Sequence, residues 1–564
     1  MSFINLQKKI KNIQAEKPNM SLAVLGDVST QFLKIALQAI GMDNDIILDV
    51  YESQYDVVIQ EILDDDSGLY QFNPDNLLLY FSSEKLLDDF YHCPVKERTG
   101  FADNWMNSLS SLLNKISVKM KKTNILIYDF IEKDDGIFAG YALKTESSFL
   151  YQVRKLNLLL SQEIMKRKNV FIVSLNSLAL EKGTENIFSY PLFDASKVSI
   201  KPDYLEELAK RTISVLSALR GKIRKGIIVD LDNTLWGGVI GDDGIDGIQI
   251  GEHGIGRAFL RLQKYLKEME RRGIVLCVCS KNDIGNAKEP FISHPEMILH
   301  LDDFALFVAN WEDKATNIRY IQSVLNVSMD SLVFLDDNPF ERNLVRTMIP
   351  EITVPELPKD PSLYVSYLRN LNLFEVTSIS EEDSKRVSQY QAEGKREEAK
   401  KSFTSIEDYL KQLKMVSKYS SFKEKNISRI SQLSLRSNQF NLRTIRYTES
   451  DIKRIINDSN YLTIEFSLND RFGDSGLISA LILKKDENIL FIDTWIMSCR
   501  VLKRTMESFI INQLVELCRE KGITQLVGEY LSTKKNSMVA DLYQRMGFIK
   551  SEDGLFVLNI RDAK

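Results

Sequence analysis

Two carboxylates, Asp230 and Asp232, stand directly after the apolar run at residues 227–229. Carboxylate oxygens are hard ligands of the kind that Mg²⁺ prefers, and a bound divalent cation lets a carboxylate attack a phosphorus atom. A second carboxylate, two residues later, can donate a proton to the leaving group and then accept one from water. The pair therefore predicts phosphoryl chemistry, with Asp230 as nucleophile and Asp232 as acid and base. An acidic turn without function is the alternative reading of such a pair taken alone.

A second segment adds a phosphate-binding hydroxyl. The apolar run at residues 274–279 ends in Ser280, and Lys281 and Asn282 follow directly. We expect the Ser280 hydroxyl to contact the phosphoryl group and place Lys281 and Asn282 in the same phosphate site.

Two more segments complete the set. Lys314 opens a helical pattern of apolar residues and predicts an ammonium group that neutralises phosphate, while the run at residues 331–335 ends in Asp336 and Asp337, which predict metal ligands. Strands and helices alternate, and ligands of such sheets bind beyond the carboxyl ends of the strands. The four groups occur in one order along the chain, which favours a catalytic site over an isolated acidic turn.

The interval between Asp232 and Ser280 limits what can cover the site. A helix expected over residues 255–271 uses much of it, and the glycine-rich remainder, residues 236–251, is long enough for a flap but not for a separate cap domain. A site without a cap domain admits a large partner such as a protein-bound thiol.

Residues 224–350 resemble a phosphotransferase domain of the haloacid dehalogenase (HAD) superfamily. The blocks DLDNTLWGGVIG (residues 230–241), CSKND (279–283) and DDNP (336–339) resemble the FkbH-like group, and RSNQFN (436–441) and DRFGDSG (470–476) extend the likeness. The resemblance implies a Rossmann-like parallel sheet and a Mg²⁺ site made by Asp230, the backbone carbonyl of Asp232, Asp336 and Asp337.

The same resemblance implies an activity. FkbH-like proteins use 1,3-bisphosphoglycerate, release phosphate and deliver the glyceryl unit to the thiol of a phosphopantetheinylated acyl carrier protein in polyketide or nonribosomal peptide pathways. A phosphohydrolase acting on another small or protein-bound phosphate is the first alternative. A carrier-docking scaffold without activity is the second, although a binding protein has no need of the second carboxylate, Asp232.

The resemblance also implies a glyceryl thioester on the enzyme, for which two cysteines are candidates. Cys279 lies beside Ser280, but strand alternation places the two on opposite faces, and buried cysteines usually act as small hydrophobic residues. Cys499 lies beside the cationic Arg500, which would lower the pKa of a thiol. Cys279 is preferred slightly, and direct attack by the thiol of the carrier remains a further possibility.

Residues 1–220 resemble an α/β domain of the SGNH-hydrolase type. Strands are expected in the apolar runs at residues 22–25, 77–80, 125–128 and 170–173. Val28 stands where the nucleophilic serine of that family would be, and no D-x-x-H motif ends the region. Ser29 and Thr30 have no evident histidine partner. We therefore expect a structural or carrier-docking role for this domain.

Residues 426–564 resemble a GNAT-type acyltransferase, with strands expected at residues 477–483 and 489–496 and a helix over 506–519. The turn that would hold pantetheine pyrophosphate reads RVLKRT (residues 500–505) and lacks both glycines, which argues against coenzyme A binding. Its cations would suit an acidic carrier protein, or would simply form a basic helix start at the surface. These carrier-binding candidates are Arg500, Lys503 and Arg504.

Composition bounds the remaining possibilities. The chain has 564 residues, a formal net charge of −5, 44% hydrophobic residues and five cysteines. The acidic balance argues against a nucleic-acid-binding protein, and no apolar run has the ~20 residues of a membrane span. Residues 1–17 do not form a signal peptide, and the odd number of cysteines predicts reduced thiols and a cytoplasmic location. The four histidines show no metal-ligand spacing.

These patterns together predict a multidomain α/β enzyme. The expected domains are an SGNH-like domain at residues 1–220, the catalytic HAD domain at 221–355, a helical connector at 356–425 and a GNAT-like α+β domain at 426–564.

Overall fold

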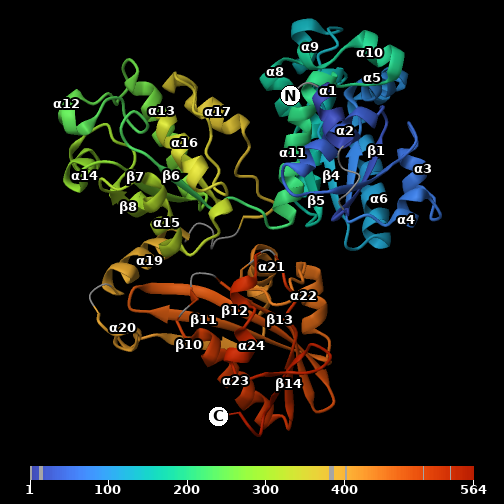
Figure 1. Ribbon diagram of the computed structural model, residues 1–564. Coiled ribbons are helices and arrows are strands. Elements are labelled where there is room, and N and C mark those ends of the chain that lie inside the picture. The colour runs from blue at the N-terminus through green and yellow to red at the C-terminus, as the bar shows by residue number, and fades with distance from the viewer. Residues whose placement is uncertain are drawn as a thin grey trace. The chain divides into compact units, whose positions relative to one another are not determined.

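The computed structural model describes residues 3–11, 17–379, 386–400, 403–437, 439–498, 501–502, 504–533 and 535–563. The chain divides into two compact units, residues 1–217 and 218–564 (Figure 1). Both units combine parallel β-strands with helices, which confirms the expected multidomain α/β class. The division into four domains stays a prediction.

The N-terminal unit is built on a parallel sheet of five strands in the order β2-β1-β3-β4-β5. The four apolar runs expected as strands form β1 (Met20–Gly26), β3 (Asn76–Tyr80), β4 (Asn124–Tyr128) and β5 (Val170–Val173). The sequence analysis missed β2 (Leu48–Glu52), because this edge strand carries acidic residues and only Leu48 is buried. Along β1, Leu22 and Val24 are as buried as Ala23 and Leu25, so both faces of the sheet are covered.

Helices supply this cover. They are α1 (Phe3–Lys11), α2 (Gln31–Met42), α3 (Val58–Leu63), α4 (Gly68–Phe72), α5 (Ser83–His92), α6 (Phe101–Lys119), α7 (Phe149–Ile164), α8 (Leu175–Lys182), α9 (Thr184–Ile187), α10 (Tyr190–Ser196) and α11 (Leu205–Leu219). Helices α5 and α7 begin at serines, Ser82 and Ser148, whose hydroxyls accept a hydrogen bond from a backbone N–H of the first turn. Such caps define where a helix starts.

The second unit begins with a parallel sheet of four strands in the order β8-β7-β6-β9. Its elements are β6 (Gly226–Val229), α12 (Ile240–Gly247), α13 (Gly256–Arg271), β7 (Val275–Ser280), α14 (Ile284–Ser293), β8 (Phe304–Ala309), α15 (Lys314–Leu325), β9 (Leu332–Leu335), α16 (Pro339–Met348) and α17 (Tyr364–Asn370). All residues of β6, β7 and β9 are buried, as expected of parallel strands covered on both faces. The central position of β6 places its carboxyl end beside those of β7 and β9.

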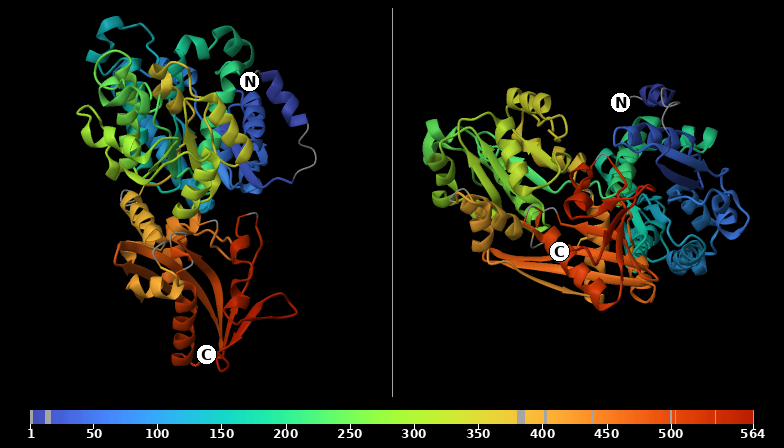
Figure 2. Two further views of the ribbon diagram at one scale, coloured as in Figure 1. Left: turned by 60° about the vertical axis from the view of Figure 1, so that its left-hand side comes forward. Right: turned by 60° about the horizontal axis from the view of Figure 1, so that its bottom comes forward.

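The rest of this unit contains a mixed sheet of seven strands in the order β10-β11-β12-β13-β14-β16-β15. The elements are α19 (Arg386–Lys400), α20 (Ile406–Gln412), β10 (Val416–Ser420), α21 (Ile427–Arg436), α22 (Glu449–Ile456), β11 (Tyr461–Asp470), β12 (Gly473–Asp486), β13 (Ile489–Met497), α23 (Met506–Glu520), β14 (Gln525–Gly528), α24 (Leu542–Arg545), β15 (Ile549–Lys550) and β16 (Phe556–Asn559). Side chains alternate along β12: Leu481 and Leu483 pack with α23, while Ala480 and Ile482 pack with α21 and α22. The strands of this sheet are drawn in orange and red in Figure 2.

The expected helical connector is only partly helical. Residues 416–420 form β10, which pairs antiparallel with β11 and so belongs to the seven-stranded sheet. Helix α19 packs against β8, where Gly394 lets the backbones approach: a Cβ there would lie 3.1 Å from the carbonyl oxygen of Ala305. The strand was missed because β10, with the sequence VSKYS, has no fully buried residue.

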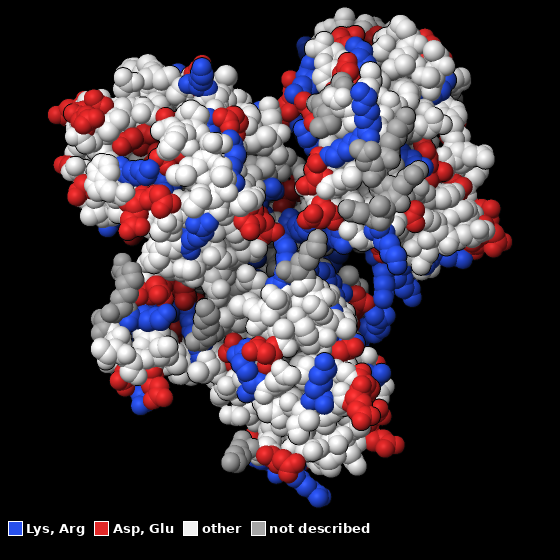
Figure 3. All heavy atoms as spheres, in the orientation of Figure 1, with Lys and Arg blue, Asp and Glu red and all other residues white. Residues whose placement is uncertain are grey.

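Acidic and basic side chains lie intermingled over the face of the molecule drawn in Figure 3. Within the described residues, no helix combines the length and the apolar character needed to cross a membrane.

Candidate active site

Asp230 lies one residue beyond β6, at the carboxyl edge of the parallel sheet. Its N–H donates to the carbonyl oxygen of Leu335 (2.9 Å), which extends the pairing of β6 with β9 by one residue. The side chain is buried, and its Oδ2 lies 2.8 Å from Lys314 Nζ. Its other oxygen, Oδ1, is buried without a hydrogen-bond partner. Buried polar atoms nearly always have a partner, so this oxygen is available to a ligand.

Two further carboxylates lie beside Asp230. One oxygen each of Asp230, Asp336 and Asp337 lies within 4.8 Å of the other two. The side chain of Arg342 fixes this segment, because its Nη1 donates to the carbonyl oxygens of Asp336 (2.8 Å) and Asp337 (2.5 Å). The backbone N–H of Asp337 donates to Thr234 Oγ1 (3.1 Å). The structure thus brings together the three side chains that were predicted to bind metal.

The charges of this cluster are not balanced within the protein. Lys314 Nζ contacts Asp230 Oδ2 and also Asp336 Oδ2 (2.5 Å), and among the described residues it is the one cation that forms an ion pair with any of the three carboxylates. Burial and the charge of Asp230 raise the pKa of Asp336 to about 6, and the same causes raise the pKa of Asp337. Burial opposes the charge of Lys314, but the two carboxylates outweigh it and raise the pKa of the ammonium group. A second cation would relieve this excess of negative charge.

Asp232 is held by a different set of donors. Its Oδ1 accepts hydrogen bonds from Trp236 Nε1 and from the backbone N–H of Ile240, both at 3.0 Å, and its Oδ2 accepts one from Asn282 Nδ2 at 3.1 Å. Burial, which these bonds oppose, raises its pKa. The carboxylate is not part of the three-residue cluster, and a metal contact through its backbone carbonyl stays a prediction.

The segment over the site is packed rather than open. Residues 236–251, expected as a flap, include helix α12, which contacts α14. Trp236 is fully buried, with its ring centroid 5.6 Å from that of Phe291. Sequence reasoning missed Trp236 as a partner of Asp232; its signal was a tryptophan placed four residues after the acid, inside a block of glycines.

The predicted phosphate-binding residues take different positions. Ser280 is the last residue of β7 and is buried at the same sheet edge. Lys281 Nζ, however, pairs with Glu341 Oε1 (2.6 Å), and Asn282 binds Asp232. Glu341, at the start of α16, is buried with Oε2 unpartnered, and the sequence analysis did not identify it. Lys281 is therefore tied to an internal carboxylate, and Asn282 positions the second acid.

The buried position of Cys279 contradicts its predicted role as acyl carrier. Its side chain is 0% exposed and packs with Ala315, Ile318 and Phe334 on the face of the sheet opposite Ser280. Burial raises the pKa of its thiol far above the ordinary value. Cys279 is therefore a core residue; Cys499 lies outside the described residues.

Arg504 is likewise not available to a carrier protein. It is buried, pairs with Glu393 of α19, and its Nη1 lies 3.3 Å from Asp470 Oδ2. Arg396 binds the same aspartate at 2.8 Å. The predicted surface role of Arg504 is wrong, because Glu393 and Asp470 neutralise its charge inside the unit. Arg500 and Lys503 lie outside the described residues.

Nothing in the described N-terminal unit activates a serine. Val28 is buried, the backbone N–H of Ser29 donates to the carbonyl oxygen of Lys197 (2.9 Å), and Thr30 Oγ1 donates to Glu52 Oε1 (2.6 Å). The one histidine of this unit, His92, contacts the carbonyl oxygen of Asp88 through Nδ1 (2.7 Å).

Comparisons with known proteins identify the family of this chain. The family model described as FkbH, N-terminal domain, matches residues 21–217. The crystal structure of the N-terminal part of the protein BF1531 from Bacteroides fragilis, which contains a phosphatase domain complexed with Mg, is 41% identical; the match covers 67% of this chain and all of that one, with a TM-score of 0.65. The chain belongs to the FkbH-like HAD proteins. Its family and the site described above make this FkbH-like protein an enzyme of the phosphatase type.

Weaker likenesses involve acetyltransferases. The Escherichia coli ribosomal-protein-S18-alanine N-acetyltransferase is 14% identical to the FkbH-like chain. The match covers 26% of the FkbH-like chain and 94% of the acetyltransferase, with a TM-score of 0.21. The PaiA N-acetyltransferase from Thermoplasma acidophilum, solved with coenzyme A, is 13% identical over 25% and 96%, with a TM-score of 0.20. No curated protein matches the chain.

Proposed function

We propose that this enzyme converts 1,3-bisphosphoglycerate, a carrier-protein thiol and water into a glyceryl thioester on the carrier and two phosphate ions. The observation that carries the phosphoryl part is the buried, unpartnered Oδ1 of Asp230 beside Lys314 and two further carboxylates. The glyceryl and carrier parts rest on membership of the FkbH-like family.

The three carboxylates fit a divalent cation, because they carry more negative charge than Lys314 neutralises. Asp230, Asp336 and Asp337 would hold Mg²⁺, the ion in the Bacteroides fragilis structure. When bound, Mg²⁺ would screen the charge between the nucleophile and the phosphoryl oxygens.

In this proposal Asp230 Oδ1 attacks the phosphorus atom of the 3-phosphate. A bond forms between Oδ1 and phosphorus, and the bond between phosphorus and the glyceryl oxygen breaks. Asp232 gives its proton to that leaving oxygen, and the raised pKa of its carboxyl group helps to keep the proton available. Water then attacks the phosphorus atom of the aspartyl phosphate and gives a proton to Asp232. The bond between phosphorus and Asp230 Oδ1 breaks and phosphate leaves, which restores the carboxylate of Asp230 and the protonated Asp232. Ser280 and Lys314 hold the phosphoryl oxygens.

The acyl phosphate reacts separately with a thiolate, which forms the C–S bond and expels the first phosphate. Because Cys279 is buried, we infer direct attack by the pantetheine thiol of the carrier, with Cys499 as the alternative relay.

Intact-protein mass spectrometry tests the proposal. The enzyme is incubated with 1,3-bisphosphoglycerate, Mg²⁺ and a holo carrier protein. A carrier heavier by one glyceryl group supports it. Asp230→Asn should leave the carrier with a phosphoglyceryl group or unmodified, never with glyceryl. Phosphate release with an unmodified carrier in the native enzyme would indicate a phosphohydrolase, and the absence of both products a docking scaffold.

A further inference from the structure

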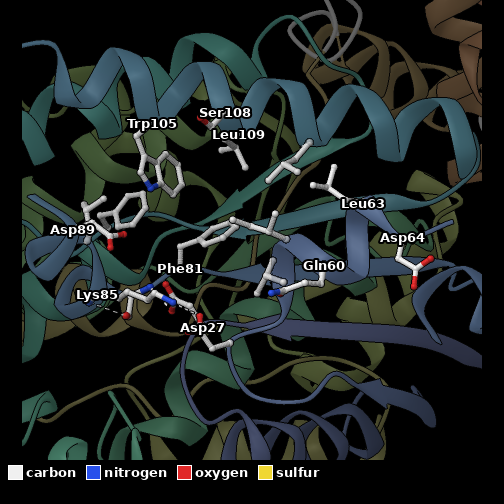
Figure 4. A pocket seen from close by; sticks show the side chains of 17 residues that line it. Asp27, Gln60, Leu63, Asp64, Phe81, Lys85, Asp89, Trp105, Ser108 and Leu109 are labelled. Carbon is white, nitrogen blue, oxygen red and sulfur yellow. Dashed lines mark hydrogen bonds and ion pairs between the residues drawn. The ribbon is translucent and has the colours of Figure 1, made fainter. Parts of the chain in front are cut away.

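The N-terminal unit contains a cavity of about 810 Å³ that the proposed function does not use (Figure 4). It lies beyond the carboxyl ends of β1, β3 and β4 and is lined by α3, α5 and α6. Its volume falls in the range of small-molecule sites, roughly 300 to 1,000 Å³.

The place of this cavity in the sheet is informative. In the order β2-β1-β3-β4-β5, the connections of β1 to β2 and of β3 to β4 run in opposite directions along the sheet. Asp27 follows β1 and Ser82 follows β3, and both line the cavity. Parallel α/β sheets bind ligands at this reversal of strand order, where two adjacent loops diverge.

Aromatic side chains make the middle of the cavity apolar. The Trp105 ring contacts those of Phe81 and Phe130 edge-on, with centroids 5.2 and 5.0 Å apart. Leu109 of α6 and the half-exposed Leu63 of α3 continue this surface. Such a preformed aromatic wall favours an apolar ligand body.

The charged residues of the cavity are mainly acidic. Asp27 is 8% exposed, and its Oδ1 accepts a hydrogen bond from the N–H of Ser82 (2.8 Å). Lys85, the only cation of the lining, forms an ion pair with Asp56. Asp89 lies near Asp27 and Lys85 at one end, and Asp64 lies at the other (Figure 4). The lining therefore carries excess negative charge after its lysine is paired.

The ionised form of Asp27, at the base of this cavity, lowers the stability of the folded protein. Burial raises the pKa of Asp27 to about 7, although the hydrogen bond from Ser82 and the charge of Lys85 act in the other direction. Asp56 faces the same group and adds to the rise. A perturbed acid in a concave site is typical of functional positions.

We propose that this cavity binds a small molecule with an apolar chain or ring and a primary ammonium group, which is held by the carboxylate of Asp27. The excess negative charge of the lining favours a cationic group on the ligand, and the aromatic wall favours an apolar chain or ring. The role is binding and not hydrolysis, because Val28 supplies no nucleophile and His92, which contacts the carbonyl oxygen of Asp88, is not among the residues that line the cavity. This site is independent of the phosphoryl chemistry proposed above.

Three probes of the same shape test the proposal by calorimetry on the full chain: 4-phenylbutylamine, 4-phenylbutan-1-ol and 4-phenylbutyrate, at about pH 8 where Asp27 is ionised. We expect the amine to bind about tenfold more tightly than the alcohol, and the carboxylate to bind least. Asp27→Asn should abolish the preference for the amine while the alcohol still binds. Trp105→Ala should weaken both.

Asp103→Asn is the matched control, because Asp103 lies on α6 outside the lining and pairs with Lys155. It should bind all three probes as the native chain does. Circular dichroism and the release of phosphate in the activity assay report whether each variant is folded. Equal binding of the three probes, a preference for the amine that survives Asp27→Asn, or no binding by any probe would overturn the proposal.

Discussion

Lys314 Nζ lies 2.8 Å from Asp230 Oδ2, whereas Asp230 Oδ1 is buried without a partner. The lysine thus orients one oxygen of the carboxylate and leaves the other free to contact a ligand. The same ammonium group contacts Asp336 at 2.5 Å, so one side chain connects the proposed nucleophile with the loop proposed to bind metal.

Removing Lys314 should therefore affect both folding and activity. In Lys314→Met, the buried carboxylates of Asp230 and Asp336 lose their counter-charge, which we expect to lower the free energy of unfolding by about 3 to 5 kcal/mol in the absence of Mg²⁺. Phosphate release should fall about 100-fold or more, because the cation that faces the phosphoryl group is lost. Urea unfolding and a phosphate assay measure the two effects. Lys264→Met, at an exposed pair with Glu252, should change neither, and a Lys314→Met variant of native stability would contradict the role of the lysine.

Mg²⁺ should stabilise the native protein through the three carboxylates. At a concentration about 100 times the dissociation constant, one bound ion adds about 2.7 kcal/mol to the free energy of unfolding. Asp336→Asn should lose most of this gain, as measured by thermal unfolding with and without Mg²⁺ or EDTA. Asp302→Asn, on an exposed residue, is the control and should keep it. An equal response of both variants would mean that the ion binds elsewhere.

Trp236 should act as a positioning residue for Asp232. Trp236→Phe removes the hydrogen bond to Asp232 Oδ1, which favours the ionised carboxylate, so the pKa of Asp232 should rise further. The alkaline limb of the pH–rate profile for kcat, where Asp232 loses the proton that it must donate, should then move to higher pH, with kcat lowered about tenfold and KM little changed. Trp311→Phe, at a residue that is 76% exposed, is the matched control. A lower kcat with an unmoved limb would indicate only a packing defect.

Asp27 should make the N-terminal unit less stable as pH rises. The folded protein holds the proton of this carboxyl group up to about pH 7, whereas the unfolded chain releases it near the ordinary value of 3.8. Between these values the folded state binds more protons, so stability falls with increasing pH and levels off above 7. Asp27→Asn lacks this dependence and should exceed the native chain in stability at about pH 8 by an amount on the order of a few kcal/mol. Hydrogen exchange of amides in β1 and β3 measures the difference, which should shrink toward about pH 4; Asp103→Asn should follow the native chain.

Cys279 should be dispensable for acyl transfer. We expect Cys279→Ala to keep the rate of glyceryl transfer within about threefold while losing about 1 to 2 kcal/mol of stability from the cavity it leaves. Cys499→Ala tests the other thiol. A glyceryl adduct seen by mass spectrometry in the native enzyme and absent only from Cys279→Ala would show that the buried thiol becomes accessible during turnover.

The catalytic edge of the sheet was predictable because it depends on local patterns. Buried strands end where polar residues begin, so the positions of Asp230, Ser280 and Asp336 follow from sequence alone. The opposite orientation of Cys279 also follows from strand alternation.

What could not be predicted depends on partners far apart in the chain. Arg504 was expected at the surface, but it meets Glu393, 111 residues away. Lys281 was expected on phosphate, but it meets Glu341, 60 residues away. No periodicity encodes such pairs, since they are created when separately formed elements pack.

The helical segment over the site has a kinetic consequence. Trp236 and the backbone of Ile240 hold the carboxylate of Asp232, and both belong to residues 236–251, whose helix α12 packs against α14. If a bulky substrate displaces this segment on entry, both hydrogen bonds to Asp232 break. We therefore expect Asp232 to be unoriented while this segment is displaced. The carboxyl group can donate its proton only after the segment has packed again. This order of events would keep an incompletely bound substrate from losing its phosphate.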